Sequence, residues 1–412
     1  MTSKNETDEG TGLARQATCP ACGHHVAVAF FNGGRQPLAT LAWPRSVEAA
    51  RSMARLPLDF VRCVNCGHVY NAAFDYAAVP YADNPNLMFN RGSVWNDYLE
   101  DLRDRVLEHL PESPTVVEIG CGEGHFLRRL AEARPTGRYI GFDPNGEVDI
   151  GDGRMAFHRE LFEPERDLPV FRPDLVVSRH VLEHLMNPLG FVQVLAFAVS
   201  CHNLPTRLFI EVPCIDRVFA SGRTADFYYE HNSHFTTRSL QRMLERSGAE
   251  VEAIGHGYDD EVVHSFARFA PQRAQAEIAA EGQDFFFRAE RARTTIAAQL
   301  AELAKSGVRT AIWGGTGKGA AFIANYGADA ERFPLVVDSD PLKVGTFVPG
   351  AGQPIRFRDV LLEEPATVII IPTQWRARDI MLEIERTGIV YDRILIEHDG
   401  RLIDFLRDPH PY

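Results

Sequence analysis

The sequence predicts an α/β protein in which a small cysteine-knuckle domain precedes two βαβ domains. Two C-x-x-C pairs stand within the first 66 residues of the chain. Two later segments, residues 114–133 and 308–327, each read as an apolar strand, a glycine turn and an amphipathic helix. After each helix a second apolar strand ends in an acid, Asp143 in one case and Asp338 in the other. This repeat is typical of a parallel sheet covered by helices.

The composition is that of a globular protein with two or three domains: 412 residues, 45% of them hydrophobic and 24% charged. A formal net charge of -13 argues against a broad phosphate-binding surface, so we expect no nucleic-acid partner. No apolar run approaches the roughly 20 residues that span a bilayer, and the start of the chain, MTSKNETDEGTG, lacks the pattern of a signal peptide. We expect a cytoplasmic monomer or weak homodimer without a membrane partner. It would have a disordered tail over residues 1–15 and domains over residues 16–80, 81–285 and 286–412.

Four of the seven cysteines form two knuckles, CPACGHH and CVNCGHVY. A tight turn lets two thiolates face one ion, and the following glycine relieves the backbone where its amides crowd the sulfur. We therefore predict a structural zinc site with no open position for a substrate, made by Cys19, Cys22, Cys63 and Cys66. The insert between the pairs, residues 26–62, has to fold as an excursion of its own. A buried pair of free thiols or a thioredoxin-type redox centre is the alternative interpretation.

The first glycine turn carries Glu118 ahead of Gly120, Gly122 and Gly124. It differs from the dinucleotide fingerprint G-x-G-x-x-G in its last spacing and in the acid before the first glycine. Asp143 ends the next strand, RYIGFD, where an α/β sheet places a carboxylate that accepts both hydroxyls of a ribose. The combination resembles the class I S-adenosylmethionine (SAM) methyltransferases. The resemblance implies that the glycines approach SAM and that Glu118 faces its amino-acid moiety. An NAD-binding sheet is the alternative.

Two further strands agree with this resemblance. The segment GRMAFHRELFEP places Glu160 near a strand end, where such enzymes contact the adenine side of SAM. The segment PDLVVSRHVLEHLMNP is a fourth strand that runs into RHVLEHL, residues 179–185. That run looks like the part of a methyltransferase that lines the methionine end of the cofactor, so His180 is a further candidate for binding SAM.

The segment ADFYYEHNSHF gathers two tyrosines, a carboxylate and two histidines between Tyr228 and His234. It follows the strand RLFIEVP, whose carboxyl end faces the same crevice as the glycine turn. Because histidine titrates near neutral pH, His231 is a candidate base, and an adjacent Glu or Tyr would hold it in one tautomer. A solvated polar loop that caps the helix TRSLQRMLERSG is the alternative.

The last domain repeats the strand, glycine turn and helix in VRTAIWGGTGKGAAFIANYG. The turn is not a Walker A loop, because Lys318 is followed by Gly319 and not by Ser or Thr. The strands of FPLVVDSDP and ATVIIIP continue the pattern. We therefore predict a second Rossmann-like domain, either suited to a nucleotide or merely built on the same fold.

In this order, the knuckles, the SAM-type sheet with YEHxSxF and the terminal sheet with WGGTGKG and VVDSDPLKVGTFVPG resemble the zinc-containing C-methyltransferases of deoxysugar biosynthesis. The resemblance implies methylation at C-3 of a 4-keto sugar attached to a nucleoside diphosphate, commonly dTDP. It also implies that His231 abstracts the proton α to the ketone with help from Tyr228 and Glu230. His184 would lie near the enolate oxygen, and Tyr81 would reach the site from the knuckle domain.

The chain departs from this family at three places. Pro85 stands near the position of an expected second aromatic, Gln374 precedes Trp375 where a Trp-Asn pair is expected, and His234 replaces an aromatic. These departures do not affect the zinc and SAM assignments, but they leave open which molecule accepts the methyl group. An O- or N-methyltransferase and a non-catalytic SAM or nucleotide sensor therefore stay as alternative functions.

Overall fold

The computed structural model describes residues 14–80, 92–146 and 153–412. They form two compact units, residues 1–276 and 277–412, which we describe separately. The boundary between the units falls inside a long helix, α8 (Arg273–Lys305). The first unit therefore contains the knuckle domain together with the first βαβ domain.

The N-terminal part of the first unit is a five-stranded antiparallel sheet in the order β1-β2-β3-β4-β10. Its strands are β1 (Ala14–Gln16), β2 (Val26–Gln36), β3 (Leu56–Cys63), β4 (Val69–Asn71) and β10 (Ser233–His234). The expected tail through residue 15 is wrong for Ala14 and Arg15, which pair with Val28 and Ala27 of β2. The insert folds as the β2–β3 hairpin, with a short helix, α1 (Val47–Ser52), and its Ser46 cap near the tip. The short 3-10 helix η1 (Tyr76–Ala78) follows β4.

The fifth strand of this sheet comes from a distant part of the chain. In β10, Ser233 pairs with Tyr70 and His234 pairs with Val69 of β4. The segment that carries Tyr228 and His231 is thereby fixed to the knuckle domain by backbone hydrogen bonds.

A seven-stranded mixed sheet forms the rest of the first unit, in the order β11-β12-β9-β8-β5-β6-β7. Its strands are β5 (Thr115–Ile119), β6 (Arg138–Phe142), β7 (Met155–His158), β8 (Leu175–Arg179), β9 (Arg207–Pro213), β11 (Ala249–Gly257) and β12 (Val262–Phe269). β12 runs antiparallel to both of its neighbours, and the other pairs are parallel. The strand order reverses between β5 and β8, which makes the crevice at their carboxyl ends the expected ligand site.

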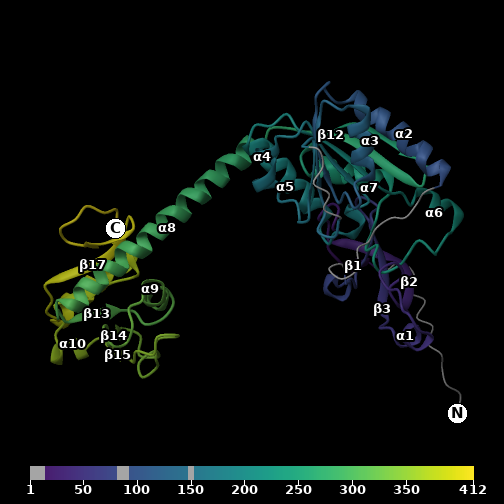
Figure 1. The fold of residues 1–412 in the computed structure, drawn as a ribbon. Helices are drawn as coiled ribbons and strands as arrows, with labels where there is room; N and C mark the ends of the chain where they lie inside the picture. The colour runs from purple at the N-terminus through teal and green to yellow at the C-terminus, as the bar shows by residue number, and fades with distance from the viewer. Residues whose placement is uncertain (1–13, 81–91, 147–152) are drawn as a thin grey trace, which may run out of the picture. The chain divides into compact units, whose positions relative to one another are not determined.

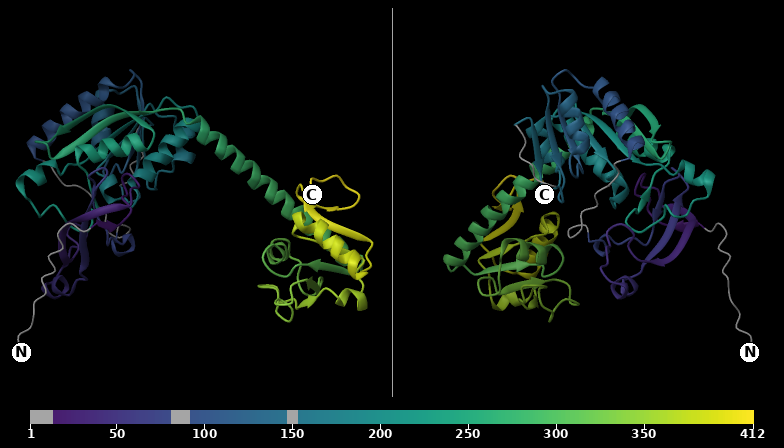
Figure 2. Two further views of the ribbon diagram at one scale, coloured as in Figure 1. Left: turned by 180° about the vertical axis from the view of Figure 1, so that it is seen from behind. Right: turned by 45° about the vertical axis from the view of Figure 1, so that its right-hand side comes forward.

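Helices cover both faces of this sheet because its strand residues alternate between two cores. Val116 of β5 packs in the core under α2 (Ser93–Glu108) and α3 (His125–Ala133). Its neighbour Val117 packs in the core under α4 (Pro164–Phe171), α5 (Pro188–Cys201) and α7 (Thr237–Arg246). Figure 1 shows α2 and α3 side by side on one face, and Figure 2 shows the N-terminal strands lying below the large sheet in both views. The short helix α6 (Asp216–Ser221) follows β9.

The second unit is a six-stranded sheet in the order β15-β14-β13-β16-β17-β18. Its elements are β13 (Thr310–Trp313), α9 (Lys318–Tyr326), β14 (Leu335–Asp338), β15 (Ile355–Phe357), α10 (Val360–Glu363), β16 (Val368–Ile370), η3 (Gln374–Arg376), α11 (Ala377–Thr387), β17 (Arg393–His398) and β18 (Arg401–Asp404). All pairs are parallel except β17 with β18, as the predicted βαβ pattern requires. A Cβ atom at Gly319 would lie 1.9 Å from the carbonyl oxygen of Gly314, so the turn before α9 needs glycine there. Among the described residues, no helix has an apolar stretch long enough to cross a bilayer.

Candidate functional site

The four predicted metal ligands meet where the β1–β2 and β3–β4 connections come together. All four are buried, and their sulfur atoms lie within 4.8 Å of one another: Cys19, Cys22, Cys63 and Cys66. Two of the S–S distances, Cys19 to Cys66 and Cys22 to Cys63, are 3.6 Å. Four sulfurs bound to one tetrahedral zinc at about 2.3 Å are separated by roughly 3.8 Å. The cluster therefore fits a closed four-thiolate site.

Each knuckle turn is closed in the same way. The amide of Gly23 donates to the carbonyl of Cys19 at 2.9 Å, and the amide of Gly67 donates to the carbonyl of Cys63 at 3.0 Å. Both glycines have a positive φ, 73° and 81°, which explains why glycine follows each second cysteine. A hydrogen bond from the Cys19 thiol lowers the pKa of Cys66 to about 6, so one sulfur is ready to act as a thiolate ligand.

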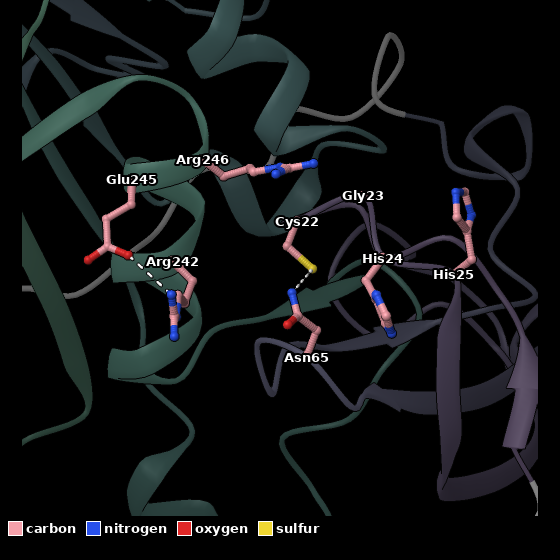
Figure 3. A pocket seen from close by; sticks show the side chains of 8 residues that line it. All are labelled: Cys22, Gly23, His24, His25, Asn65, Arg242, Glu245 and Arg246. Atoms are coloured by element: carbon pink, nitrogen blue, oxygen red, sulfur yellow. Dashed lines mark hydrogen bonds and ion pairs between the residues drawn. The ribbon is translucent and has the colours of Figure 1, made fainter.

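A pocket lies beside this cluster, between the knuckle and α7 (Figure 3). In that view the side-chain amide of Asn65 points at Cys22, and the two atoms are 3.7 Å apart. The pocket is lined by Cys22, Gly23, His24, His25, Asn65, Arg242, Glu245 and Arg246. None of the predicted catalytic or SAM-binding residues is among them, which agrees with a structural role for the cysteine cluster.

The glycine turn between β5 and α3 lies at the carboxyl edge of the seven-stranded sheet. Gly120, Gly122 and Gly124 all have a positive φ, of 71°, 52° and 71°. A Cβ atom at Gly120 would lie 2.3 Å from the side chain of Val181, and one at Gly124 would lie 2.4 Å from that of Phe157. Only glycine fits these positions, so the backbone is open to close approach by a ligand.

Two carboxylates stand beside the glycine turn, as the sequence predicted. Burial raises the pKa of Glu118 to about 7. Its Oε2 is buried and has no hydrogen-bond partner among the described residues, which makes it complementary to an ammonium group. Asp143 follows β6 and accepts hydrogen bonds from the amides of Gly122 and Asn145 at 2.9 and 2.8 Å. Glu118, Asp143 and the glycine turn thus lie at one edge of the sheet. The two carboxylates would fit the amino-acid and ribose ends of SAM.

Glu160 follows β7, next along the same edge of the sheet. Its carboxylate lies 3.7 Å from Nδ1 of His158 and 3.5 Å from a guanidinium nitrogen of Arg166. All three groups are at least partly exposed, so these ion pairs contribute little to stability. The position at the strand end is the one expected of a residue on the adenine side.

A network of buried charges joins the ends of β8 and β9. Arg179 donates to Glu211 at 2.8 Å, Nε2 of His180 lies 3.1 Å from the same carboxylate, and the hydroxyl of Tyr98 also donates to it. Burial lowers the pKa of His180, but the carboxylates of Glu183 and Glu211 outweigh this effect and raise it to about 9. His180 is therefore a cation near neutral pH. The sequence analysis missed Arg179 and Glu211, although charged residues inside the apolar strands LVVSR and RLFIEVP were a usable signal.

The predicted catalytic histidines lie together at the same edge. The hydroxyl of Tyr228 is 2.8 Å from Nε2 and 3.0 Å from Nδ1 of His231. The ring centroids of His184 and His231 are 4.7 Å apart. Nδ1 of His184 lies 2.9 Å from the carbonyl oxygen of Glu230, which only accepts, so Nδ1 carries the proton and Nε2 is the basic nitrogen of the neutral ring. Burial, and then the neighbouring His184, hold the pKa of His231 well below its usual value, which keeps this ring neutral at pH 7.

The carboxylate of Glu230 contacts the knuckle domain. Its Oε1 accepts hydrogen bonds from the amides of Ala39 and Thr40 at 2.8 Å and of Leu41 at 3.1 Å, and its Oε2 accepts from Ala39 at 3.1 Å. Glu230 is fully buried. These contacts tie the β2–β3 insert to the loop that carries His231, a role that the sequence did not indicate.

The structure adds Glu183 to the candidates. This residue lies in the 3-10 turn η2 (Leu182–His184) and is 1% exposed. One of its oxygens lies within 4.8 Å of ring nitrogens of both His184 and His231. The signal was present in LEHL, where the acid directly precedes His184. Tyr81, the remaining catalytic candidate, lies outside the described residues.

Comparison with known proteins gives matches to two family models. A methyltransferase domain matches residues 94–254, and a C-methyltransferase C-terminal domain matches residues 259–389. A curated relative, the C-methyltransferase NovU of Streptomyces niveus, is 25% identical over 367 residues, which cover 82% of this chain and 84% of that protein. The expected class I α/β fold of the central domain agrees with the first match.

Solved structures with partial similarity cover less of the chain. Magnesium protoporphyrin IX methyltransferase from Synechocystis PCC 6803, with bound S-adenosylhomocysteine, is 16% identical over 45% of this chain and 90% of that one, with a TM-score of 0.32. A SAM-dependent methyltransferase from Aquifex aeolicus is 17% identical over 48% of this chain and 100% of that one, with a TM-score of 0.30.

Proposed function

Because the chain is a SAM-dependent methyltransferase similar to the C-methyltransferases, we propose that it methylates C-3 of a 4-keto deoxysugar carried on a nucleoside diphosphate. The observation that supports transfer to carbon is the cluster of Tyr228, His231 and His184, whose residues follow β8 and β9 of the sheet that carries the glycine turn. A hydroxyl or amine acceptor needs at most one base. A carbon acceptor needs a base and also a second group that stabilises the enolate oxygen.

SAM supplies the electrophilic methyl group, and the remaining work falls to the protein. Glu118, with a buried oxygen that has no hydrogen-bond partner in the described part of the chain, and the open turn at Gly120 and Gly122 suit the amino-acid end of the cofactor. Asp143 and Glu160 suit the ribose and adenine, and His180 adds a positive charge at the end of β8. The four-cysteine cluster would hold a structural zinc ion that keeps the two hairpins together.

In the proton-transfer step, His231 takes the proton from the carbon next to the ketone onto a ring nitrogen. The C–H bond breaks, an N–H bond forms, and the electron pair moves into the enolate, whose charge develops on oxygen. The neutral state of His231 leaves it free to accept a proton. His184 stabilises the enolate oxygen by donating from Nε2. For this the ring has to take up a second proton from solvent before the step, because Nδ1 already donates to a carbonyl.

The test follows the carbon atom directly. The protein is incubated with SAM that carries a ¹³C-labelled methyl group and with a dTDP-linked 4-keto deoxysugar, and the product is analysed by NMR. We expect a new methyl carbon bonded to C-3. In a second arm, with S-adenosylhomocysteine bound in D₂O, we expect the hydrogen at C-3 to exchange. Labelling on oxygen or nitrogen without exchange would instead favour an O- or N-methyltransferase.

A further inference from the structure

We propose that Glu183 is a positioning residue that provides the counter-charge for the His184–His231 pair and so sustains the imidazolium formed during proton abstraction. This inference rests on the proposed function. It adds a residue that acts through the two histidines and does not touch the substrate.

The geometry of Glu183 carries the proposal. The residue is 1% exposed, and neither carboxylate oxygen has a hydrogen-bond partner among the described residues. One oxygen lies within 4.8 Å of ring nitrogens of His184 and His231. A buried carboxylate without such partners is costly, and it is usually retained where a charge or a donor faces it. Here the facing groups are three imidazoles: those of His184 and His231, and that of His180, whose Nδ1 lies 3.6 Å from Oε1 of Glu183.

The other buried carboxylates near the site are engaged elsewhere. Glu230 accepts from the amides of residues 39–41, and Glu211 is bound by Arg179 and Tyr98. Glu118 lies beside the glycine turn and is assigned to the cofactor. Of the four, Glu183 is the one whose oxygen lies with both imidazoles in one compact cluster.

The electrostatic need for this charge is plain from the surroundings of His231. Burial is the first cause that lowers its pKa, and the nearby histidines lower it further. The titratable groups that face this ring from the packed elements are His184 and Glu183 of η2, Tyr228 of its own loop, His234 of β10 and His180 after β8. Glu183 supplies the negative charge in this set. An opposite charge within about 4–6 Å typically favours the charged form by 1–3 pKa units.

A second effect of the same charge is visible at Tyr228. Burial raises the pKa of this phenol, and the Glu183 carboxylate is the next cause. The hydroxyl that contacts His231 therefore keeps its proton across the working pH range. This agrees with a Glu183 carboxylate that faces the Tyr228–His231 pair.

The experiment compares Glu183→Gln, which removes the charge at nearly constant shape, with Glu183→Asp, which retains it. Solvent-deuterium exchange at C-3 of the dTDP-linked 4-keto deoxysugar is measured with S-adenosylhomocysteine bound. We expect Glu183→Gln to slow exchange by about tenfold or more and to move the acidic limb of its pH profile down by about one unit. Glu183→Asp should restore part of both. Asp167→Asn, which removes a buried carboxylate on α4 away from this cluster, is the control and should change neither.

A measurement without the acceptor separates this inference from the proposed function. In ¹⁵N-histidine-labelled protein, NMR titration of the S-adenosylhomocysteine complex should give a lower midpoint for His231 in Glu183→Gln than in the wild type. The inference holds on this result even if the wild type exchanges no deuterium, an outcome that would reject only the proposed sugar acceptor. An unchanged titration midpoint of His231 in a folded Glu183→Gln protein would overturn the inference about Glu183.

Discussion

Oε1 of Glu230 lies 2.8 Å from the backbone amide of Ala39, although the two residues are 191 positions apart in the chain. Two further amides, of Thr40 and Leu41, bind the same oxygen. A carboxylate held by several backbone amides is a strong, charge-assisted anchor. Glu230 therefore couples the folding of the knuckle insert to the position of His231, its neighbour in sequence.

The first prediction concerns this anchor. Glu230→Ala leaves the amides of residues 39–41 without their acceptor, and a buried donor without a partner costs about 1–3 kcal/mol. We expect the free energy of unfolding in urea to fall by roughly 2–4 kcal/mol in total. Glu48→Ala, an exposed acid in the same insert, is the matched control and should stay near the wild-type value. A stable Glu230→Ala protein with a collapsed kcat would instead support direct help to His231.

The second prediction concerns the metal. Wild-type protein should contain about one equivalent of zinc per chain by metal analysis. Cys63→Ser removes one of four thiolates and should lower both zinc content and the melting temperature of the knuckle domain. Cys201→Ser changes an exposed cysteine outside the cluster and should alter neither. Metal-free wild-type protein with unimpaired stability would reject the zinc site.

The third prediction concerns SAM. Asp143→Ala removes the charge-assisted acceptor that we propose for the ribose, which typically costs about 1.5–3 kcal/mol and lowers SAM affinity by roughly tenfold or more. Because Asp143 also holds the amides of Gly122 and Asn145, Asp143→Asn is measured beside it. The amide variant retains an acceptor for these amides and should lose less affinity. Calorimetry that finds unchanged SAM binding in the alanine variant would move the ribose site elsewhere.

The sequence predicted those features of the fold that depend on local pattern. Apolar β-branched runs predicted the strands around Val117 and Val176. The glycines of the first turn predicted a ligand-binding turn at the edge of the sheet. Both predictions were possible because each signal lies within a few residues. The pairing of β10 with β4 escaped prediction, since it joins residues far apart through backbone hydrogen bonds that leave no side-chain pattern.

The candidate site shows the same division. Residue types such as Cys63, Asp143 and His231 indicated a chemistry. The fold places Cys63 with three other cysteines, Asp143 against the amide of Gly122, and His231 beside His184. The direction of a side chain depends on contacts made across the whole unit. The sequence therefore predicted Glu230 as the carboxylate that assists His231. In the structure Glu230 binds backbone amides, and Glu183 lies with His184 and His231.

The fourth prediction concerns His234, which stands where an aromatic was expected. It is 3% exposed, and burial lowers its pKa from 6.5 to about 3. Between these two values the unfolded chain binds the proton and the folded chain does not, so stability falls as the pH drops below about 6.5. At pH 5 this amounts to about 2 kcal/mol.

His234→Phe removes the titrating group. The new ring would be accommodated among aromatic neighbours, because the ring centroids of Phe60 and Phe227 lie 5.2 and 4.9 Å from that of His234. We expect the difference in unfolding free energy between pH 7.5 and pH 5 to shrink by about 2 kcal/mol. His125→Gln, at an exposed histidine, should leave the difference as it is. An unaltered pH dependence in His234→Phe would mean that His234 is protonated in the folded protein.

The last prediction tests the base. His231→Ala should bind SAM and fold as the wild type does but lose about 100- to 10,000-fold in kcat, the usual contribution of a positioned base. It should also lose solvent-deuterium exchange at the carbon next to the ketone when S-adenosylhomocysteine is bound, because exchange requires proton removal but no methyl transfer. Tyr228→Phe retains the imidazole and removes only the hydroxyl 2.8 Å from it, so it should still exchange, at a reduced rate. If His231→Ala exchanges at the wild-type rate, the base is another group. His184 is then the residue to test, because its Nδ1 already donates to a carbonyl, which makes Nε2 the basic nitrogen of the neutral ring.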